Sequence, residues 1–141
     1  MAAVTRVKAR PVSPPGYEVN DKGKAAAAIT AGDLLVITSA TPGNGFDKVF
    51  DKAPDDAIYA DAIALMDAKA SAIVSAGIQG EMDGFSGMTP GTLLYPSGSV
   101  AGGLDDTATE FYAAGTTPAV SVPAQANVKA ITATRIRYNF L

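Results

Sequence analysis

The sequence predicts a mainly β protein, and three stretches of the 141-residue chain carry this prediction. Residues 34–38 (LLVIT) form an apolar, partly β-branched run with turn-forming residues on both sides. Residues 77–107 contain Gly or Pro at nearly every third position, which is typical of tight turns that join short strands. Residues 128–141 contain neither Gly nor Pro and are rich in β-branched and aromatic side chains. The chain is therefore expected to fold as strands joined by short turns.

The first 24 residues are expected to be extended. They lack helical periodicity, and the three prolines between positions 11 and 15 favour extended or turn backbone. The alternating pattern from Val4 to Arg10 is compatible with a short strand. We therefore predict an extended N-terminal arm over residues 1–24, ordered where it lies on another surface, followed by a single β-rich domain over residues 25–141.

The interior of the chain is predicted to contain three strands. One covers residues 34–39, and two more are expected at about 61–67 and 72–83. A helix is the alternative over residues 55–76, because this segment is rich in Ala, but the surrounding β pattern favours strands. Residues 46–52 place their apolar side chains at helical spacing, with an irregular strand as the alternative.

Residues 128–141 are predicted to form one long closing strand that runs to the last residue and has two different faces from Thr134 onward. Apolar and polar side chains alternate there, so one face would be apolar and the other basic and polar. The apolar set is Thr134, Ile136, Tyr138 and Phe140, and the polar set is Arg135, Arg137 and Asn139. Residues 41–45 and 115–118 are predicted to be loops from their Gly and Pro content.

Charge is distributed unevenly along the chain, whose net charge is −3. Residues 1–24 hold five basic and two acidic residues, residues 25–111 hold three basic and twelve acidic ones, and residues 112–141 hold three basic residues and no acidic one. The basic ends could remain solvated, pair with the acidic middle of a neighbouring copy in a dimer or trimer, or bind an acidic partner. We predict partner contacts at seven residues: Arg6, Lys8, Arg10, Tyr17, Arg135, Arg137 and Tyr138.

The composition removes several kinds of catalytic site. The chain has no His and no Cys, so Ser-His-Asp, Cys-His and His-based metal sites are excluded. Glu81 and Asp83 would share one face of a strand, but two acids on a face are more often solvated surface. The spacings Gly77-x-x-Gly80 and Gly84-x-x-Gly87 lack the Gly-Lys-Ser/Thr of a phosphate loop and indicate turns. We therefore expect no enzyme activity, no cofactor and no metal ion.

Membrane and nucleic-acid partners are also not expected. The chain contains no run of about 18 apolar residues, and its N-terminus lacks the apolar core of a signal peptide. The chain is therefore expected to be soluble and made in a cytoplasm. Tyr17 is the one aromatic residue of the arm, and the chain as a whole is acidic, which argues against direct nucleic-acid binding.

A succession of short segments resembles the capsid cement (decoration) proteins of tailed bacteriophages. The segments, in order, are AGDLLV at 31–36, AIAL at 62–65, GEMDGF at 80–85, MTPGTLLY at 88–95 and GGL at 102–104. The resemblance implies a small β-rich domain of the jelly-roll, β-sandwich or barrel kind. It also implies a homo-oligomer on the outer surface of a virion, where it clamps neighbouring major capsid proteins of the HK97-like fold and catalyses no reaction.

The alternative to a cement protein is a glycan-binding module on a virion or cell surface. Such a module needs an exposed aromatic platform, for which Tyr95, Tyr112 and Tyr138 are the candidates. An enzyme that uses Glu81 and Asp83 is a third possibility, and it predicts that amide replacement of both residues would abolish a turnover activity without unfolding the chain.

Overall fold

The computed structural model describes residues 4–14, 16–39, 48–55, 57, 59–107, 110–112, 121–123 and 125–141. The regular secondary structure of this part of the chain consists of strands alone, so the prediction of a mainly β protein is confirmed. The strands are β1 (Thr5–Pro11), β2 (Val19–Ala25), β3 (Leu34–Ser39), β4 (Val49–Lys52), β5 (Ala62–Ala64), β6 (Ile73–Ser86), β7 (Leu93–Pro96), β8 (Leu104–Asp105), β9 (Glu110–Tyr112), β10 (Ser121–Pro123), β11 (Val128–Ala130) and β12 (Ile136–Asn139).

Five strands close into a small barrel in the order β2-β4-β3-β5-β6, and pairing of β2 with β6 completes the circle. The barrel is narrow, and its interior is filled mainly by small side chains around the ring of Phe50. Gly23 is part of this arrangement, since a Cβ there would lie 2.8 Å from Phe50 ring atoms. The buried interior residues are Ala25, Ile29, Leu35, Phe50, Ala62, Ala64, Val74 and Ala76.

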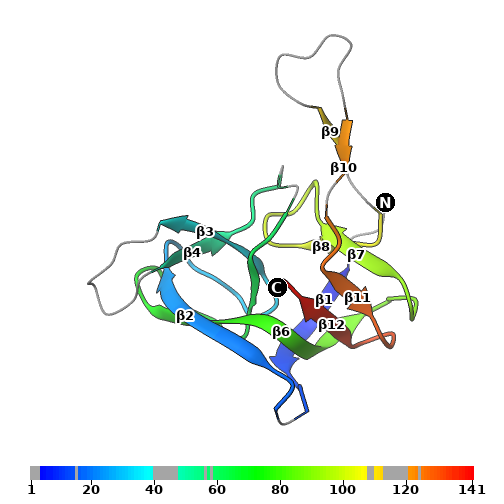
Figure 1. Cartoon of the computed structure of the whole chain (residues 1–141), viewed down its shortest axis with the longest axis horizontal. Coiled ribbons are helices and arrows are strands. Elements are labelled where there is room, and N and C mark those ends of the chain that lie inside the picture. The colour runs from blue at the N-terminus through cyan, green and yellow to red at the C-terminus, as the bar shows by residue number, and fades with distance from the viewer. Residues whose placement is uncertain are drawn as a thin grey trace.

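The long strand β6 connects the barrel to the rest of the molecule (Figure 1). Its first half pairs with β2 and β5, and its second half pairs with β1 and β12. From β12 the sheet continues through β11 and β7 to β8, while β9 and β10 form a separate two-stranded ribbon. A second core fills the space beneath these strands, with Tyr138, Phe85, Met82, Ile136 and Leu94 among its largest buried side chains.

The strands expected in the interior of the chain are present. The strand predicted at 34–39 is β3, and those predicted near 61–67 and 72–83 are β5 and β6, with β6 running three residues further. The alternative helix over 55–76 is absent from the described residues of that segment. Residues 49–52 form β4, so the irregular-strand alternative holds there. The predicted loops at 41–45 and 115–118 lie outside the described residues.

The prediction of turns at the glycine spacings is wrong for Gly77, Gly80 and Gly84, which lie inside β6. Gly77 and Gly80 are required by packing, because the ring of Tyr138 crosses β6 at both positions and comes within 3.0 Å of where a Cβ would sit. Gly87 does lie in a turn just after β6, with a φ of 76°. Glycines that make room for a packed aromatic ring and glycines that form turns therefore look alike in the sequence, because both positions exclude a side chain.

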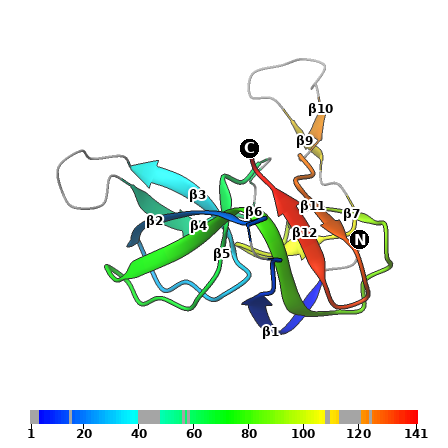
Figure 2. The ribbon, with the colours of Figure 1, turned by 60° about the horizontal axis from the view of Figure 1, so that its bottom comes forward.

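The first 24 residues are extended where the structure describes them, and they form strands of the main sheet. β1 pairs with the end of β6 and β2 with its beginning, so both lie along the same long strand (Figure 2). Ala9 of β1 and Ala25, the last residue of β2, are buried. The boundary expected between residues 24 and 25 thus falls within β2, one of the strands that close the barrel.

The buried hydroxyl of Tyr138 predicts a loss of stability at high pH. Burial raises the pKa of Tyr138 from 10.0 to about 12; the nearby Ser13 hydroxyl opposes this rise, and Glu18 and Tyr17 add to it. The folded chain therefore keeps this proton where the unfolded chain loses it, so the stabilisation is complete below pH 10 and lost as pH rises toward 12. We expect the free energy of unfolding to fall by about 2–3 kcal/mol over this window.

The measurement is urea unfolding at a series of pH values for the wild type and for Tyr138→Phe. The variant keeps the ring and removes a hydroxyl that has no hydrogen-bond partner in the described structure. Its stability should therefore lack this decline, while any effect of lysine titration is common to both proteins. Parallel pH profiles for the two proteins would contradict the assignment.

Candidate partner-binding surface

The prediction of one long strand over residues 128–141 is wrong, because β11 and β12 pair antiparallel and the chain reverses direction between them. Within β12 the two predicted faces are present, although Thr134, expected on the apolar face, precedes the strand and is exposed. Ile136 and Tyr138 are buried in the second core, whereas Arg137 and Asn139 are exposed on the outer face of the sheet. Pairing extends this alternation to the neighbouring strands, because Arg137 lies opposite Lys129 of β11 on one side and Glu81 of β6 on the other. The outer face therefore carries a row of charged residues that runs across three strands.

Glu81 is the internal counter-ion of this row. Its carboxylate Oε2 lies 3.2 Å from Nη2 of Arg137, which donates a hydrogen bond to it. Ser13, in the connection between β1 and β2, accepts a hydrogen bond from the Glu81 backbone amide at 2.8 Å. The Arg137 guanidinium also lies 5.9 Å from the centre of the Tyr17 ring, at cation–π distance. The residues between β1 and β2 thus pack over Glu81 and hold Arg137 in place.

Asp83, two residues further along β6, is a second carboxylate on the outer face. The Gly84 backbone amide and the Thr134 hydroxyl, aided by Arg135 and Arg10, hold the pKa of Asp83 below its usual value. The Arg10 guanidinium approaches it only to 3.8 Å and remains 70% exposed. Asp83 is therefore ionised at neutral pH, and its ion pair with Arg10 is long and exposed to solvent.

We call this surface the basic face. It is defined by the cations Lys8, Arg10, Lys129, Arg135 and Arg137 with the carboxylates Glu81 and Asp83. Its five cations exceed its two carboxylates by three charges, although the whole chain has a net charge of −3. A local positive excess on an acidic protein attracts an acidic surface and orients its approach.

Five of the seven residues predicted as partner contacts lie on or beside the basic face: Lys8, Arg10, Tyr17, Arg135 and Arg137. Tyr138 is only 1% exposed, so its ring belongs to the core and presents no surface. Arg6 is used internally, because its guanidinium lies 2.7 Å from the buried carboxylate of Asp33 and donates to the Ala31 carbonyl oxygen.

Lys129 is a member of the basic face that the sequence did not identify. It is exposed on β11, directly opposite Arg137 in one direction and Leu93 of β7 in the other. Two like charges directly opposite each other weaken a strand pair. Their presence is therefore better explained by binding than by stability. The position of Lys129 opposite Arg137 depends on the register between β11 and β12. The sequence shows only the alternation within each strand, so it could not reveal this pair.

A shallow hollow of about 260 Å³ lies beside this pair of cations. Leu93, half-exposed, and the side chains of Lys129, Arg137, Asn127 and Asn139 are among the residues that line it. The lining combines an apolar surface with cations and amides, which suits an acidic protein segment that carries some aliphatic side chains.

Glu81 and Asp83 share a face of β6, as their spacing predicted. Each is engaged by an arginine, so the structure gives them the role of counter-ions on the basic face. Asp105 differs from both, since it is buried and neither of its carboxylate oxygens has a hydrogen-bond partner among the described residues. The described residues contain no group of three or more side chains suited to hold a metal ion. Among them there is also no helix with the length and apolarity to cross a membrane.

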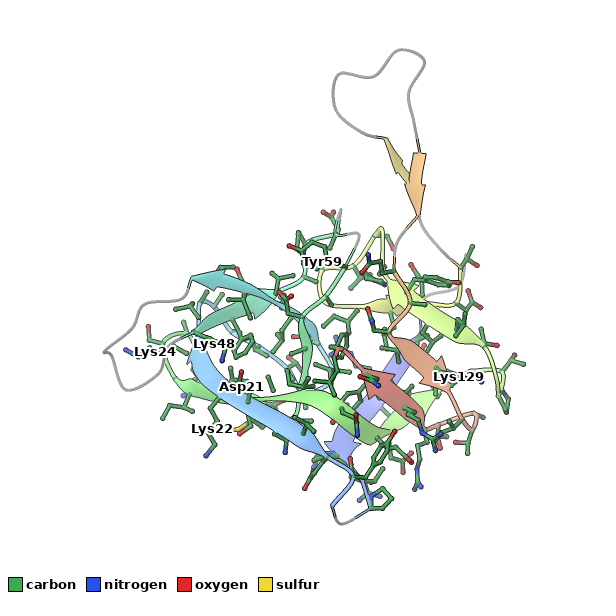
Figure 3. All side chains as sticks on the ribbon, viewed as in Figure 1. Asp21, Lys22, Lys24, Lys48, Tyr59 and Lys129 are labelled. Carbon is green, nitrogen blue, oxygen red and sulfur yellow. The ribbon has the colours of Figure 1, made fainter. Side chains whose placement is uncertain are left out.

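A second group of lysines lies on the barrel, away from the basic face. Figure 3 shows Lys22 and Lys24 on β2 and Lys129 at the other side of the molecule. Within this group, Lys48 lies 2.5 Å from the Asp21 carboxylate. Burial raises the pKa of Asp21, but the contact with Lys48 and the Lys22 amide outweigh it and lower the pKa overall. Lys22 and Lys24 therefore provide matched control positions for charge reversal.

Comparisons with known proteins identify no relative of the chain: no family model, no curated protein and no solved structure matches it.

Proposed function

We propose that the protein is a capsid cement protein, which binds the outer surface of a tailed-phage head and clamps neighbouring major capsid proteins of the HK97-like fold. The observation that carries the proposal is the basic face, an exposed surface of positive charge on an otherwise acidic domain. The ordered segments from AGDLLV at 31–36 to GGL at 102–104 give it further support through their resemblance to such proteins.

A clamping role requires a stable shape more than a deep site. The closed barrel leaves its strands without free edges, and the basic face extends over the sheet next to it. An expanded, DNA-filled head is under outward load, and each clamp raises the free energy needed to separate two subunits. Contacts that are weak one by one become strong when the symmetry of a shell, or a homo-oligomer of the chain, repeats them.

The test is cosedimentation of the purified protein with expanded and unexpanded heads of the phage that encodes it. We expect binding to expanded heads, with weaker binding as salt increases, because exposed charges are screened. Arg10→Glu combined with Lys129→Glu should reduce the bound fraction strongly. Lys22→Glu combined with Lys24→Glu changes the net charge equally and should bind as the wild type. If neither form of the head binds the wild type, the proposal fails.

The alternative, a glycan-binding module, has less support. It needs an exposed aromatic platform, yet Tyr138 is buried and Tyr95 is half-buried. The Tyr112 side chain lies outside the described residues. Binding to a glycan array, together with no binding to heads, would reverse the ranking of the two functions.

A further inference from the structure

The strand β1 has one edge that is paired and one that is not. In the part of the chain that the structure describes, β1 pairs with β6 alone, and its register shifts between Arg6 and Arg10. Figure 2 shows β1 at the lower margin of the molecule, below β6. Among the described residues, the backbone of residues 5–11 makes no hydrogen bond to another backbone group outside this pairing. A strand edge of this kind offers backbone N–H and C=O groups to another extended chain.

Two hollows meet at the middle of β1, and Val7 lines both of them. The first, of about 360 Å³, lies on the basic face between Val7, Arg10, Phe85 and Thr134. The second, also about 360 Å³, lies between Val7 and the residues Leu65 and Met66, which follow β5. Val7 is 77% exposed, so an added chain could cover its side chain.

The two hollows suit the side chains of a strand added to β1. Successive side chains of a strand point to opposite faces of the sheet, so neighbouring residues of an added strand would reach one hollow each. Apolar side chains fit against Phe85 in the first hollow and against Leu65 and Met66 in the second.

Charge decides which kind of strand fits. Lys8 lines both hollows and Arg10 lines the first. Two carboxylates also lie here: Asp83 lines the first hollow, close to Arg10 and Arg135, and Asp67 lines the second hollow. Together with Arg135, the three cations exceed these two carboxylates by one charge, so the edge has a small positive excess. A second copy of β1 is a poor occupant, because a twofold antiparallel pair would place the basic residues of one strand against those of the other.

We propose that the free edge of β1 accepts an extended strand from another protein, with alternating acidic and apolar residues. The inference rests on the proposed function, in which the strand belongs to a shell protein and the basic face attracts it. Backbone hydrogen bonds to β1 supply the pairing, and the cations and hollows select the sequence.

The experiment uses the full chain and three blocked heptapeptides. One alternates Val with Glu, one alternates Val with Lys, and one carries the acidic sequence with two central Val replaced by Pro. Hydrogen exchange of the backbone amides reports strand pairing, and calorimetry reports affinity. We expect the acidic peptide to protect the amides of residues 6–10 and to bind roughly tenfold tighter than the basic one. The proline peptide should fail to protect them, because it cannot continue a ladder. Equal binding and protection by the acidic and proline peptides would overturn strand pairing.

Variants locate the site. Lys8→Glu with Arg10→Glu should abolish binding of the acidic peptide, whereas Lys22→Glu with Lys24→Glu should bind it as the wild type does. Urea unfolding confirms that both variants are folded. If the two variants lose binding equally, the peptide responds only to the net charge of the protein and the inference is wrong. If raising the protein concentration without peptide protects residues 6–10, the occupant is a second copy and the inference is also wrong.

Head binding separates this inference from the proposed function. If the acidic peptide pairs with β1 but no head binds the protein, the edge is correctly assigned and the cement role fails. If heads bind the protein without protecting residues 6–10, the cement role stands and the edge inference fails.

Discussion

Gly84→Ala is expected to destabilise the protein by about 2–5 kcal/mol, combining a left-handed backbone conformation with a steric clash. Gly84 has a φ of 95°, a conformation that L-residues with a side chain rarely adopt. An added methyl group would also collide with the backbone carbonyl oxygen of Lys8 and would lie 2.7 Å from the Ala9 nitrogen. Backbone atoms of a paired strand cannot move aside as a flexible side chain can, so β1 would have to shift away from β6.

Gly87→Ala is the matched control for this experiment. Gly87 also has a positive φ, of 76°, but an added methyl group there would meet no atom within 4 Å. Its substitution should show only the conformational strain, about 1–2 kcal/mol. Urea unfolding measures both changes, and hydrogen exchange of residues 5–11 should show that β1 loosens in Gly84→Ala alone. Equal losses in the two variants would mean that β1 does not press on Gly84.

The features that local sequence could predict are those encoded within one segment. The alternation of apolar and polar residues from Ile136 to Asn139 predicted the buried and exposed faces of β12, and its burial follows this alternation. The β-branched run at 34–38 likewise gave β3, because strand propensity and flanking turn residues agree there. The common face of Glu81 and Asp83 followed from the two-residue period of any strand.

What the sequence could not predict depends on contacts between distant segments. Gly77 and Gly80 were assigned to turns because nothing near them in sequence shows that the Tyr138 ring needs their space. For the same reason Tyr138 was expected at a surface that it does not reach. Only the sheet register reveals that Lys129 lies opposite Arg137. The arm of residues 1–24 became two strands because the long β6 offers a pairing edge to both of them.

The role of Arg6 also depends on a contact with a residue that is distant in the sequence. The sequence treated Arg6, Lys8 and Arg10 alike, because all three are basic residues on alternate positions of one strand. The structure separates them: the Arg6 guanidinium lies 2.7 Å from Oδ1 of Asp33, which is only 2% exposed. The other oxygen of Asp33 accepts a hydrogen bond from the Thr30 amide at 2.8 Å. Asp33 of the AGDLLV segment thus joins β1 to the turn that precedes β3.

Arg6→Ala is therefore expected to lower the free energy of unfolding by about 3 kcal/mol or more, since it leaves the Asp33 carboxylate buried without a counter-ion. Arg10→Ala, on the same strand, removes only a 3.8 Å contact of an exposed side chain and should change stability by less than about 1 kcal/mol. Arg6→Ala combined with Asp33→Asn should recover part of the loss, because the amide keeps its acceptor for Thr30 and carries no charge. Urea unfolding of the four proteins measures these differences. Equal effects of Arg6→Ala and Arg10→Ala would show that Arg6 is a surface cation, available to a partner as the sequence predicted. A large loss for Arg6→Ala alone would place Arg6 in the fold and leave Lys8 and Arg10 as the cations of β1 that can contact a partner.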